Sequence, residues 1–403
     1  GLPLVLMELK SPAKDEVGAE NAFHQIRNYM QDIPSMFYYN AICVISDLST
    51  NKAGTITSGF DRFMEWKTKD GNCEDTAYAS FETFYEGMFQ KARLLDIMKN
   101  FILFSGASNS RFKVLAAYHQ YFAVHKAIEK AKTTGVGFVS VRNSNHFGIA
   151  GYYAEMASKQ GLLGMACTNS EAIMVPTFGR KAMLGSNPIA VAMSAEPYPF
   201  LFDCSTTVVT RGKLEMYNKS GKQLPEGWAL GADGHESTDA PAVLANIVGK
   251  KGGGIMPLGG NKEVNGSHKG YGYGMLCEIF SSILSMGVTS DKCCTFKDKT
   301  GICHGFAAID PAIFGNADDI KAHFSEYLET LRQSPKAEGA EQIYTHGEKE
   351  IMAEKERREN GIPVNDNTMV ELANLCNYLK IDFGAYFKDY ELPKDSKFFS
   401  GNY

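Results

Sequence analysis

The sequence predicts a folded, mixed α/β protein, of either the α/β or the α+β class. Its 403 residues are 44% hydrophobic and 22% charged, a balance typical of folded globular proteins that excludes disorder over most of the chain. From residue 135 onward glycine becomes more frequent, and segments with strand-like and helix-like apolar spacing alternate. Such alternation indicates helices that pack on a sheet.

The first 134 residues contain both kinds of element. The apolar spacing predicts strands at 4–10 and 40–46, short strands at 54–57 and 62–66, and helices at 16–31, 93–104 and 115–132. The helix at 16–31 follows from an apolar face formed by Ala19, Ala22, Phe23, Ile26 and Met30.

The remaining residues predict a longer series of elements. The expected strands are 137–142, 163–168, 188–193, 200–203 and 306–309, and the expected helices are 148–160, 207–220, 270–284, 317–332, 347–359 and 367–379. The composition changes near 127–134, so we expect two domains, 1–126 and 127–403.

Charge and cysteine content exclude several classes of protein. The net charge of −5 argues against a chain whose main role is electrostatic capture of nucleic acid. The longest apolar runs, such as 188–195, have the length of strands, so no membrane-spanning helix is expected. The nine cysteines form no CxxC pair and no disulfide framework, which predicts a reduced, cytoplasmic protein. Because the chain opens at Gly1 with a turn and a strand, we expect it to be a fragment.

Two pairs of polar residues near the start have the pattern of a nuclease site. Glu8 and Lys10 lie on the same side of the first strand, where a carboxylate would hold Mg²⁺ and an ammonium would stabilise developing charge. A solvated ion pair at a strand edge is the alternative. Gln25 and Tyr29, four residues apart, share one helix face.

A second group of polar residues lies in the region after residue 135. His146, with Asn145 beside it, lies where a strand ends and a helix begins, a position suited to proton exchange or to helix capping. The turns at 169–179 and 185–188 allow backbone amides to approach a phosphate or ribose, or serve simply as hairpin turns.

His268 and Lys269 open a glycine-rich helix, which indicates an anion site at a helix N-terminus. No GxGxxG occurs, because residue 275 is Met, so the Rossmann fingerprint is missing. Cys293, Cys294, Cys303 and His304 also fit a zinc site, but the spacing favours strand-edge positions of a hairpin near 299–301.

Four segments in order, GLPLVLMELKSP, ENAFHQIRNYMQDIPSMFYYNAICVISD, GTITSGFDRFMEWKT and LAAYHQYFAVHKAIEK, resemble the N-terminal nuclease region of type I restriction enzyme R subunits. The resemblance implies a truncated PD-(D/E)xK-like α/β lobe over about 1–126, with Glu8, Lys10, Gln25 and Tyr29 as the site remnant. It implies Mg²⁺ and nucleic acid as ligands of this lobe alone. The acidic ligand expected before Glu8 and the GxxxxGK[ST] motif are missing.

Residues 127–403 resemble the malate/L-lactate dehydrogenase family, which has a non-Rossmann NAD(P)-binding fold and includes sulfolactate, ureidoglycolate and diketogulonate oxidoreductases. GVGFVSVRNSNHFGIAGYYAEMA, LLGMACTNSEAIMVPTFGRKAMLGSNPIAVA, SHKGYGYGMLCEIFSSILS and YTHGEKE carry the likeness. It implies hydride transfer between NAD or NADP and a small 2-hydroxy or 2-oxo acid, by a homodimer.

The same resemblance assigns roles to individual residues. His146 would donate or accept the proton, and Asn145, Asp203 and Arg211 would lie near the substrate. The residues that would contact the cofactor are Ile173, Met174, Val175, Pro176, Thr177, Phe178, Gly179, Gly185, Ser186, Asn187, Pro188, His268, Lys269, His346, Gly347 and Glu348.

The family's N-terminal helices, with a Ser-His-Gly motif and a substrate-binding Arg, do not precede residue 127. We therefore expect a 2-hydroxy-acid oxidoreductase impaired by truncation. A restriction-endonuclease fragment that binds or hydrolyses DNA and a non-catalytic chimera are the alternatives. The sequence leaves open which 2-hydroxy acid is used and whether the cofactor is NAD or NADP.

Overall fold

A computed structural model describes residues 2–11, 18–72, 81–105, 112–295, 300–364, 366–378, 380–388 and 390–392. The chain divides into two compact units, which we call the first unit (Gly1–Tyr121 with Arg357–Tyr403) and the second unit (Phe122–Glu356). The division falls inside helix α4 (Tyr118–Thr134), which also contains the expected boundary after residue 126. Arg357–Tyr403, expected in the second domain, groups instead with the first unit.

The first unit is built on a three-stranded sheet. Strand β1 (Val5–Leu9) pairs in parallel with β2 (Ile42–Ser46), and β2 pairs antiparallel with β3 (Asn51–Gly54). Helix α1 (Ala19–Asp32) packs against β1 and β2, because its apolar face, including Ala22 and Ile26, is buried there.

The short strands expected at 54–57 and 62–66 are wrong. Strand β3 ends at Gly54, and Met64 forms only an isolated bridge with Ala53. The cause is a turn closed by side chains, in which the Thr55 amide donates to Ser58 Oγ at 3.0 Å and the Ser58 amide donates to the Thr55 carbonyl at 3.0 Å.

The first unit contains further elements besides this sheet and α1. They are η1 (Pro34–Phe37), η2 (Phe60–Arg62), α2 (Phe81–Met88), α3 (Lys91–Asn100), the antiparallel pair β4 (Ile102–Ser105) and β5 (Phe112–Leu115), α11 (Asp366–Tyr378) and α12 (Phe383–Tyr386). Helix α3 ends earlier than the expected 93–104, because the chain enters β4 at Ile102.

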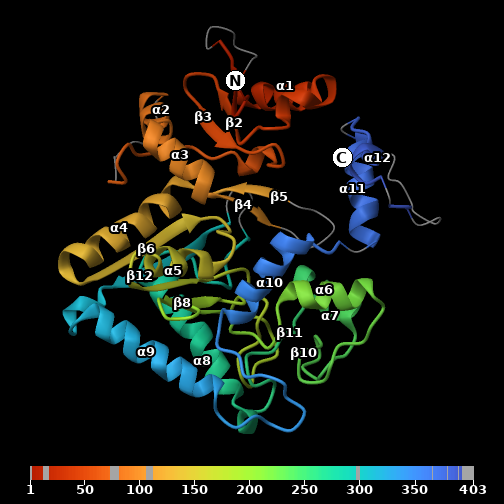
Figure 1. Ribbon diagram of the computed structural model, residues 1–403. Helices are drawn as coiled ribbons and strands as arrows, with labels where there is room; N and C mark the ends of the chain where they lie inside the picture. The colour runs from red at the N-terminus through yellow and green to blue at the C-terminus, as the bar shows by residue number, and fades with distance from the viewer. Residues whose placement is uncertain are drawn as a thin grey trace. The chain divides into compact units, whose positions relative to one another are not determined.

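The second unit contains a five-stranded antiparallel sheet (Figure 1). Its strands, in spatial order, are β6 (Val136–Ser144), β12 (Ile302–Ile309), β7 (Leu163–Thr168), β8 (Ile189–Met193) and β9 (Phe200–Cys204). All pairings within it are antiparallel, which corresponds to the α+β form of the mixed fold rather than to a parallel doubly wound sheet. Strand β12 is longer than expected, since residues 302–305 are also buried in the sheet.

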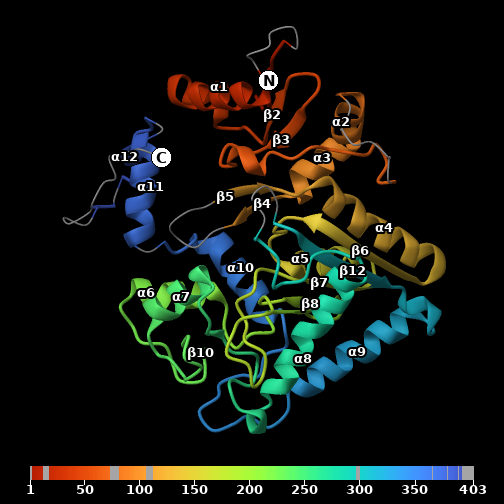
Figure 2. The same cartoon turned by 180° about the vertical axis from the view of Figure 1, so that it is seen from behind.

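Helical layers cover both faces of this sheet. A Cβ on Gly164 of β7 would lie 2.1 Å from the Ala154 carbonyl oxygen, so glycine allows α5 (Ala150–Ser158) to pack closely. A Cβ on Gly305 of β12 would lie 2.6 Å from the Phe280 carbonyl oxygen. Gly305 pairs with Cys167, three residues from Gly164, so the two glycines face opposite sides. Helix α8 (Ser267–Glu278) and the π-helical turn η4 (Ile279–Ile283) therefore lie across the sheet from α5 (Figure 2).

A smaller subdomain is inserted between β9 and α8. It contains α6 (Arg211–Lys219), α7 (Ala240–Gly249) and the strand pair β10 (Ala229–Leu230) and β11 (Gly254–Ile255), with Leu214, Val243 and Ile255 in its core. Helix α7 was not expected from the sequence, because nearly every residue in it is apolar and no amphipathic period appears.

Helices α9 (Ala317–Arg332) and α10 (Glu348–Asn360) follow the sheet, α9 with the predicted bounds. The 3₁₀ turns η3 (Glu263–Asn265) and η5 (Pro311–Ile313) complete the described elements.

Candidate active site

Helix α8 connects the two turn segments that the sequence suggests for a nucleotide. Thr177 Oγ1 lies 2.9 Å from Ser267 Oγ at the start of α8, and Asn187 Nδ2 donates to the Gly274 carbonyl at 3.1 Å. The Met174 amide donates to the Leu184 carbonyl at 2.7 Å, which holds the two segments side by side. Segments 173–179 and 185–188 therefore converge on one helix.

Only part of these segments is accessible. Ile173, Met174 and Val175 are buried in the apolar cores of the second unit, so their side chains are not exposed to a ligand. Pro176, Thr177 and Gly179 are half-buried, and Phe178 is 84% exposed with a φ of 66°. The accessible surface of the first segment is therefore 176–179.

The second segment is held rigidly by neighbouring polar groups. A Cβ on Gly185 would lie 2.2 Å from Ser170 Oγ, so only glycine fits there. The Ser186 amide donates to Ser170 Oγ at 3.1 Å, and the Ser186 carbonyl accepts from the Thr206 amide at 2.8 Å. Asn187 is fully buried and has a φ of 37°, while Ser186 and Pro188 are half-buried.

The first turn of α8 presents cationic and polar groups to solvent. His268 and Lys269 are exposed. They follow Gly266, the N-cap of α8, which has a left-handed backbone with a φ of 88°. Among the described residues Lys269 has no ion-pair partner. A lysine beside the positive end of a helix is suited to bind an anionic group such as a pyrophosphate.

His146 lies exposed between β6 and α5. Its Nδ1 accepts a hydrogen bond from the Gly148 amide at 3.1 Å, so the neutral ring carries its proton on Nε2. Asn145 Oδ1 accepts from Thr300 Oγ1 at 2.9 Å. That His146 lies at the same site as the start of α8 stays a prediction.

His304, which the sequence suggested only as a possible zinc ligand or a hairpin position, supports this segment instead. The ring is fully buried, with Nδ1 2.8 Å from Thr168 Oγ1 and Nε2 2.8 Å from Ser144 Oγ. It stacks on Phe147 at a centroid distance of 4.2 Å. His304 therefore joins the residues beside His146 to the end of β7. The sequence could not indicate this role, because the strand was expected only from residue 306.

Asp203 and Arg211 both have local partners. Asp203 Oδ2 accepts from the Gly151 amide at 2.7 Å, in the first turn of α5. Burial raises the pKa of Asp203, and the Gly151 hydrogen bond opposes that effect. Arg211 Nε donates to Glu215 at 3.0 Å, and its guanidinium lies 3.7 Å from Glu171. Their proximity to a substrate stays a prediction.

The segment 346–348 packs on the edge strand β9 and on α9. The His346 ring lies edge-on against Phe200 and Phe202, and the His346 carbonyl accepts from the Leu201 amide at 3.0 Å. Gly347 has a φ of 91°, and a Cβ there would lie 2.9 Å from that of Leu201.

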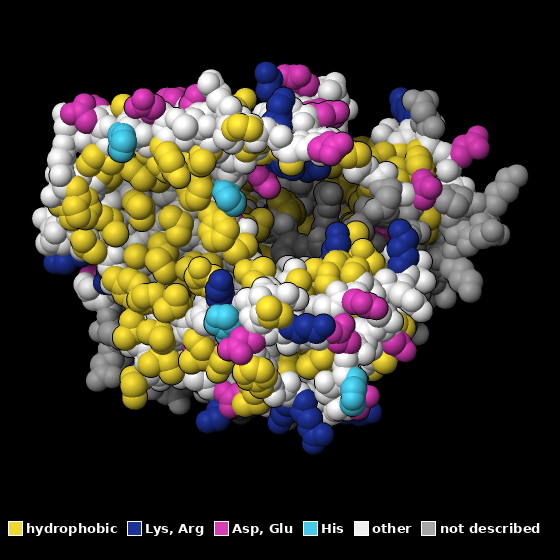
Figure 3. Space-filling view, turned by 90° about the horizontal axis from the view of Figure 1, so that it is seen from below, with side chains coloured by type: hydrophobic (Ala, Val, Ile, Leu, Met, Phe, Trp, Pro, Cys, Tyr) yellow, Lys and Arg dark blue, Asp and Glu magenta, His cyan; other side chains and the backbone are white. Residues whose placement is uncertain are grey.

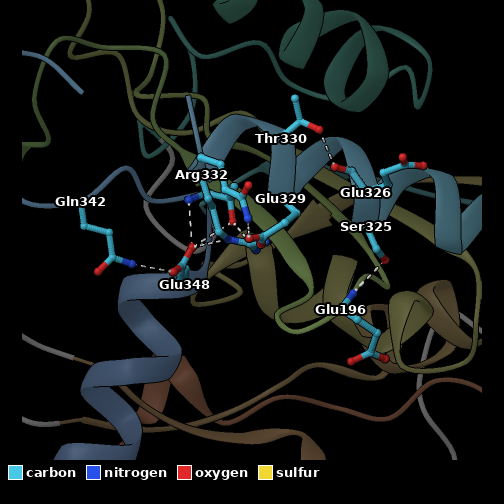
Figure 4. Close-up of polar contacts among 10 residues, drawn as sticks. Glu196, Ser325, Glu326, Glu329, Thr330, Arg332, Gln342 and Glu348 are labelled. Carbon is cyan, nitrogen blue, oxygen red and sulfur yellow. Dashed lines mark hydrogen bonds and ion pairs between the residues drawn. The ribbon is translucent and has the colours of Figure 1, made fainter. Parts of the chain in front are cut away.

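Glu348 forms a buried ion pair with Arg332 of α9 (Figure 4). Its Oε2 accepts from Arg332 Nε at 3.0 Å and from the Thr345 amide at 3.1 Å, and its Oε1 accepts from Gln342 Nε2 at 3.2 Å. Burial acts to raise the pKa of Glu348, but hydrogen bonds from Thr345 and Arg332 outweigh it and lower the pKa. The structure therefore gives this carboxylate a cross-linking role, and contact with a ribose stays a prediction.

Of the four nuclease-like residues of the first unit, Glu8 and Lys10 form an ion pair with each other. Lys10 Nζ donates to Glu8 Oε1 at 2.7 Å. Asp47, at the end of β2, is engaged elsewhere, because its carboxylate accepts from the Ala19 amide of α1 at 3.0 Å. Gln25 and Tyr29 are half-buried on α1.

No three His, Cys, Asp or Glu side chains gather as a metal-binding group within the described ranges. Part of the hairpin expected near 299–301 lies outside the described residues. Of its expected strand-edge positions, Cys293 and Cys294 lie in turns, whereas Cys303 and His304 lie in β12.

Comparison with known proteins establishes the family. The family model for malate/L-lactate dehydrogenase matches residues 113–373. The chain belongs to this family. Membership confirms the resemblance found in the sequence and makes the chain an enzyme of the hydroxy-acid dehydrogenase type. The match begins before the expected residue 127 and ends before residue 403.

Relatives of this dehydrogenase family agree in sequence and fold. A malate dehydrogenase of Pyrococcus abyssi is 42% identical over 257 residues, which are 64% of this chain and 69% of that protein. An L-sulfolactate dehydrogenase of Methanocaldococcus jannaschii is 35% identical over 66% of this chain and 73% of its own length. The crystal structure of malate dehydrogenase from Entamoeba histolytica superposes with a TM-score of 0.62 at 32% identity, covering 73% of this chain and 86% of that one.

A second family model, for the N terminus of type I restriction enzyme R proteins, matches residues 1–62. This confirms the second resemblance over a shorter stretch than the expected 1–126. Within the described residues no helix is both long and apolar enough to cross a bilayer.

Proposed function

We propose that the chain is an NAD- or NADP-dependent oxidoreductase that moves a hydride between the nicotinamide and a small 2-hydroxy acid of the malate or lactate type. The observation that carries the proposal is the convergence of 176–179, 185–188 and Lys269 on α8. The eight described cysteines are free thiols, which agrees with a reduced, cytoplasmic protein.

The residues around the start of α8 fit a dinucleotide. The exposed ammonium of Lys269 and the amides of the first helical turn are donors for a pyrophosphate, and Thr177 provides a hydroxyl beside them. Phe178 offers an exposed aromatic face for a planar ring. When bound, the nicotinamide supplies or accepts the hydride.

The chain's own residues would handle the proton and the carboxylate. His146 would deliver a proton from Nε2 to the forming alkoxide as the imidazolium and so return to the neutral ring, a step that requires Nδ1 to release the Gly148 amide and take up a proton first. Arg211 is the candidate cation for the substrate carboxylate, although Glu171 and Glu215 share its charge. We therefore propose that this chain grips the substrate weakly, because its N-terminal stretch matches the restriction-enzyme model instead of supplying the family's N-terminal helices.

Equilibrium titration with NADH, read by nicotinamide fluorescence, tests the cofactor site. We expect saturable binding that weakens about three- to tenfold in Lys269→Ala, because one charge-assisted contact is lost at a solvent-exposed position. Lys222→Ala is the matched control, since it removes an exposed lysine outside the site. If both variants lose NADH affinity equally, the loss reflects the change in net charge alone, and the assignment of the cofactor site to the start of α8 is wrong.

Residues 1–62 leave one further candidate function, cleavage or binding of DNA, because they match the restriction-enzyme model. Glu8 is the carboxylate that would hold Mg²⁺ there, and Lys10 already neutralises it at 2.7 Å. Mg²⁺-dependent nicking of plasmid DNA that disappears in Glu8→Gln would support this candidate over the dehydrogenase.

A further inference from the structure

Glu278, the last residue of α8, is a buried carboxylate surrounded by neutral groups. It is 4% exposed, and the described residues provide it with no ion pair. Its Oε1 accepts from Asn187 Nδ2 at 3.0 Å and from the Ser290 hydroxyl, and its Oε2 accepts from Ser282 Oγ at 2.5 Å. Asn169 Nδ2 lies 3.5 Å from the same Oε2.

Stability alone does not explain a carboxylate in this place. A buried charge without a counter-charge is unfavourable, and hydrogen bonds from amides and hydroxyls compensate for only part of the lost hydration. Glu348 shows the contrasting case in the same unit, because a guanidinium pairs with it. An unpaired carboxylate that persists in the interior indicates a requirement other than folding.

The groups that Glu278 holds belong to the second turn segment of the proposed cofactor site. Asn187 has a left-handed backbone, and both the oxygen and the nitrogen of its side-chain amide form hydrogen bonds. Its Oδ1 accepts from the Ser170 amide at 3.1 Å, while its Nδ2 donates to Gly274 and to Glu278. Glu278 thereby fixes which end of the Asn187 amide faces Ser170.

Asn169 extends the same network toward the sheet. Its Oδ1 accepts from the Cys303 amide at 2.8 Å, and its Nδ2 donates to the Val288 carbonyl at 2.7 Å. The helix also departs from α geometry directly after Glu278, where the π-helical turn η4 begins. Single π turns are frequent at functional sites, and the Ser282 hydroxyl within this one donates to Glu278 Oε2.

We propose that Glu278 is a positioning residue: its buried carboxylate orients Asn187 and so holds the Gly185–Pro188 segment in the conformation that receives the dinucleotide, at a cost to the stability of the fold. This inference rests on the proposed function. Glu278 acts through Asn187, without contact with the cofactor itself.

Glu278→Gln tests the proposal because it keeps the shape and replaces one acceptor by an NH₂ donor. The Ser282 and Ser290 hydroxyls can turn to accept from the new NH₂, but the Nδ2 groups of Asn187 and Asn169 can only donate, so one of these two amides loses its acceptor. We expect the Kd for NADH to rise about tenfold or more, while the thermal midpoint of the NADH-free chain stays unchanged or rises. Hydrogen exchange of the peptide containing Ser170 should accelerate without NADH present, because its amide loses Asn187 Oδ1.

Two controls separate this role from simpler ones. Glu263→Gln removes the same charge from an exposed glutamate and should leave the Kd unchanged. Asn187→Ala should reproduce the loss of affinity. Adding Glu278→Gln to Asn187→Ala should change the Kd little, because Glu278 acts on the site only through the Asn187 side chain. If the parent chain binds NADH and Glu278→Gln binds equally well, or if the midpoint falls together with the affinity, the inference is overturned. Failure of the parent chain to bind NADH overturns the proposed function first.

Discussion

At the scale of single residues, the side chains that shape the site pair over distances that local sequence does not reveal. The resemblance of 346–348 to a family motif predicts that Glu348 contacts the cofactor, yet the described contacts of Glu348 are with Arg332, Thr345 and Gln342. The sequence located the turn at 185–188 but not Glu278, which holds it from ninety-one positions away. Such pairings depend on how α8 and α9 pack against distant segments. The spacing of apolar residues predicts a helix but not its partners.

The ion pair between Glu348 and Arg332 predicts a pH-dependent contribution to stability. Glu348→Gln should lower the free energy of unfolding by about 1–3 kcal/mol at neutral pH, because Arg332 loses this buried partner and keeps the more exposed Glu329. The folded-state pKa of Glu348 lies below its unfolded value, so this contribution is present above about pH 4.3 and is lost as pH falls through the folded pKa.

Urea denaturation of both proteins across the acidic range checks this. The gap between their unfolding free energies should be constant above about pH 5 and should close at lower pH. Glu359→Gln, which alters an exposed glutamate of α10, is the control and should show no such gap. A gap that widens on acidification would contradict the sign of the pKa shift.

At the scale of elements, the sequence predicts helices and strands well where the apolar residues are clearly spaced or grouped, and poorly where they are not. Strand β7 and helix α9 have the bounds that the sequence predicts, because β7 is a short apolar run that ends at polar residues and α9 has a clear helical period. Helix α7 was missed because it is apolar all round, and the strand expected at 54–57 is a turn closed by hydroxyl groups. The antiparallel order of the sheet, with β12 inserted between β6 and β7, could not be read from chain order.

Helix α8 and the turns after it leave an apolar face that predicts self-association. Figure 3 shows hydrophobic side chains gathered over a wide area of one side of the molecule. Exposed apolar residues along α8 and its continuation are Tyr273, Met275, Leu276, Ile279, Ile283, Leu284 and Met286. A surface of this kind is rarely left open to water. We propose a homodimer that buries it.

Ile283→Asp tests the dimer, since Ile283 is 50% exposed and its substitution need not disturb the fold. In a two-fold interface the change occurs twice, so we expect dimerisation to weaken by about 3–6 kcal/mol, or two to four decades in Kd. Sedimentation velocity should show a dimer for the parent chain and a monomer for the variant. Val248→Asp on α7 is the control and should remain dimeric. A monomeric parent chain would rule the interface out.

At the scale of the whole molecule, the sequence predicted both family resemblances, while the structure divided the chain differently. Its two units meet in sequence within α4, and the last 47 residues, from Arg357, group with the first unit. Local patterns identified the two families because their motifs are contiguous in sequence. Assignment of the C-terminal helices required the three-dimensional packing of segments that lie far apart in the chain.

The most direct test of the dehydrogenase account is transfer of deuterium to oxaloacetate or pyruvate from NADH that carries deuterium at both C4 positions, followed by mass spectrometry of the 2-hydroxy acid. The account predicts labelled product at a rate about two to three decades below that of an intact family member, since one charge-assisted substrate contact is weak. His146→Ala should abolish most of that transfer, and His235→Ala, a change of an exposed histidine outside the site, should not. Product without label above a protein-free control would contradict the account, as would a rate equal to that of an intact dehydrogenase.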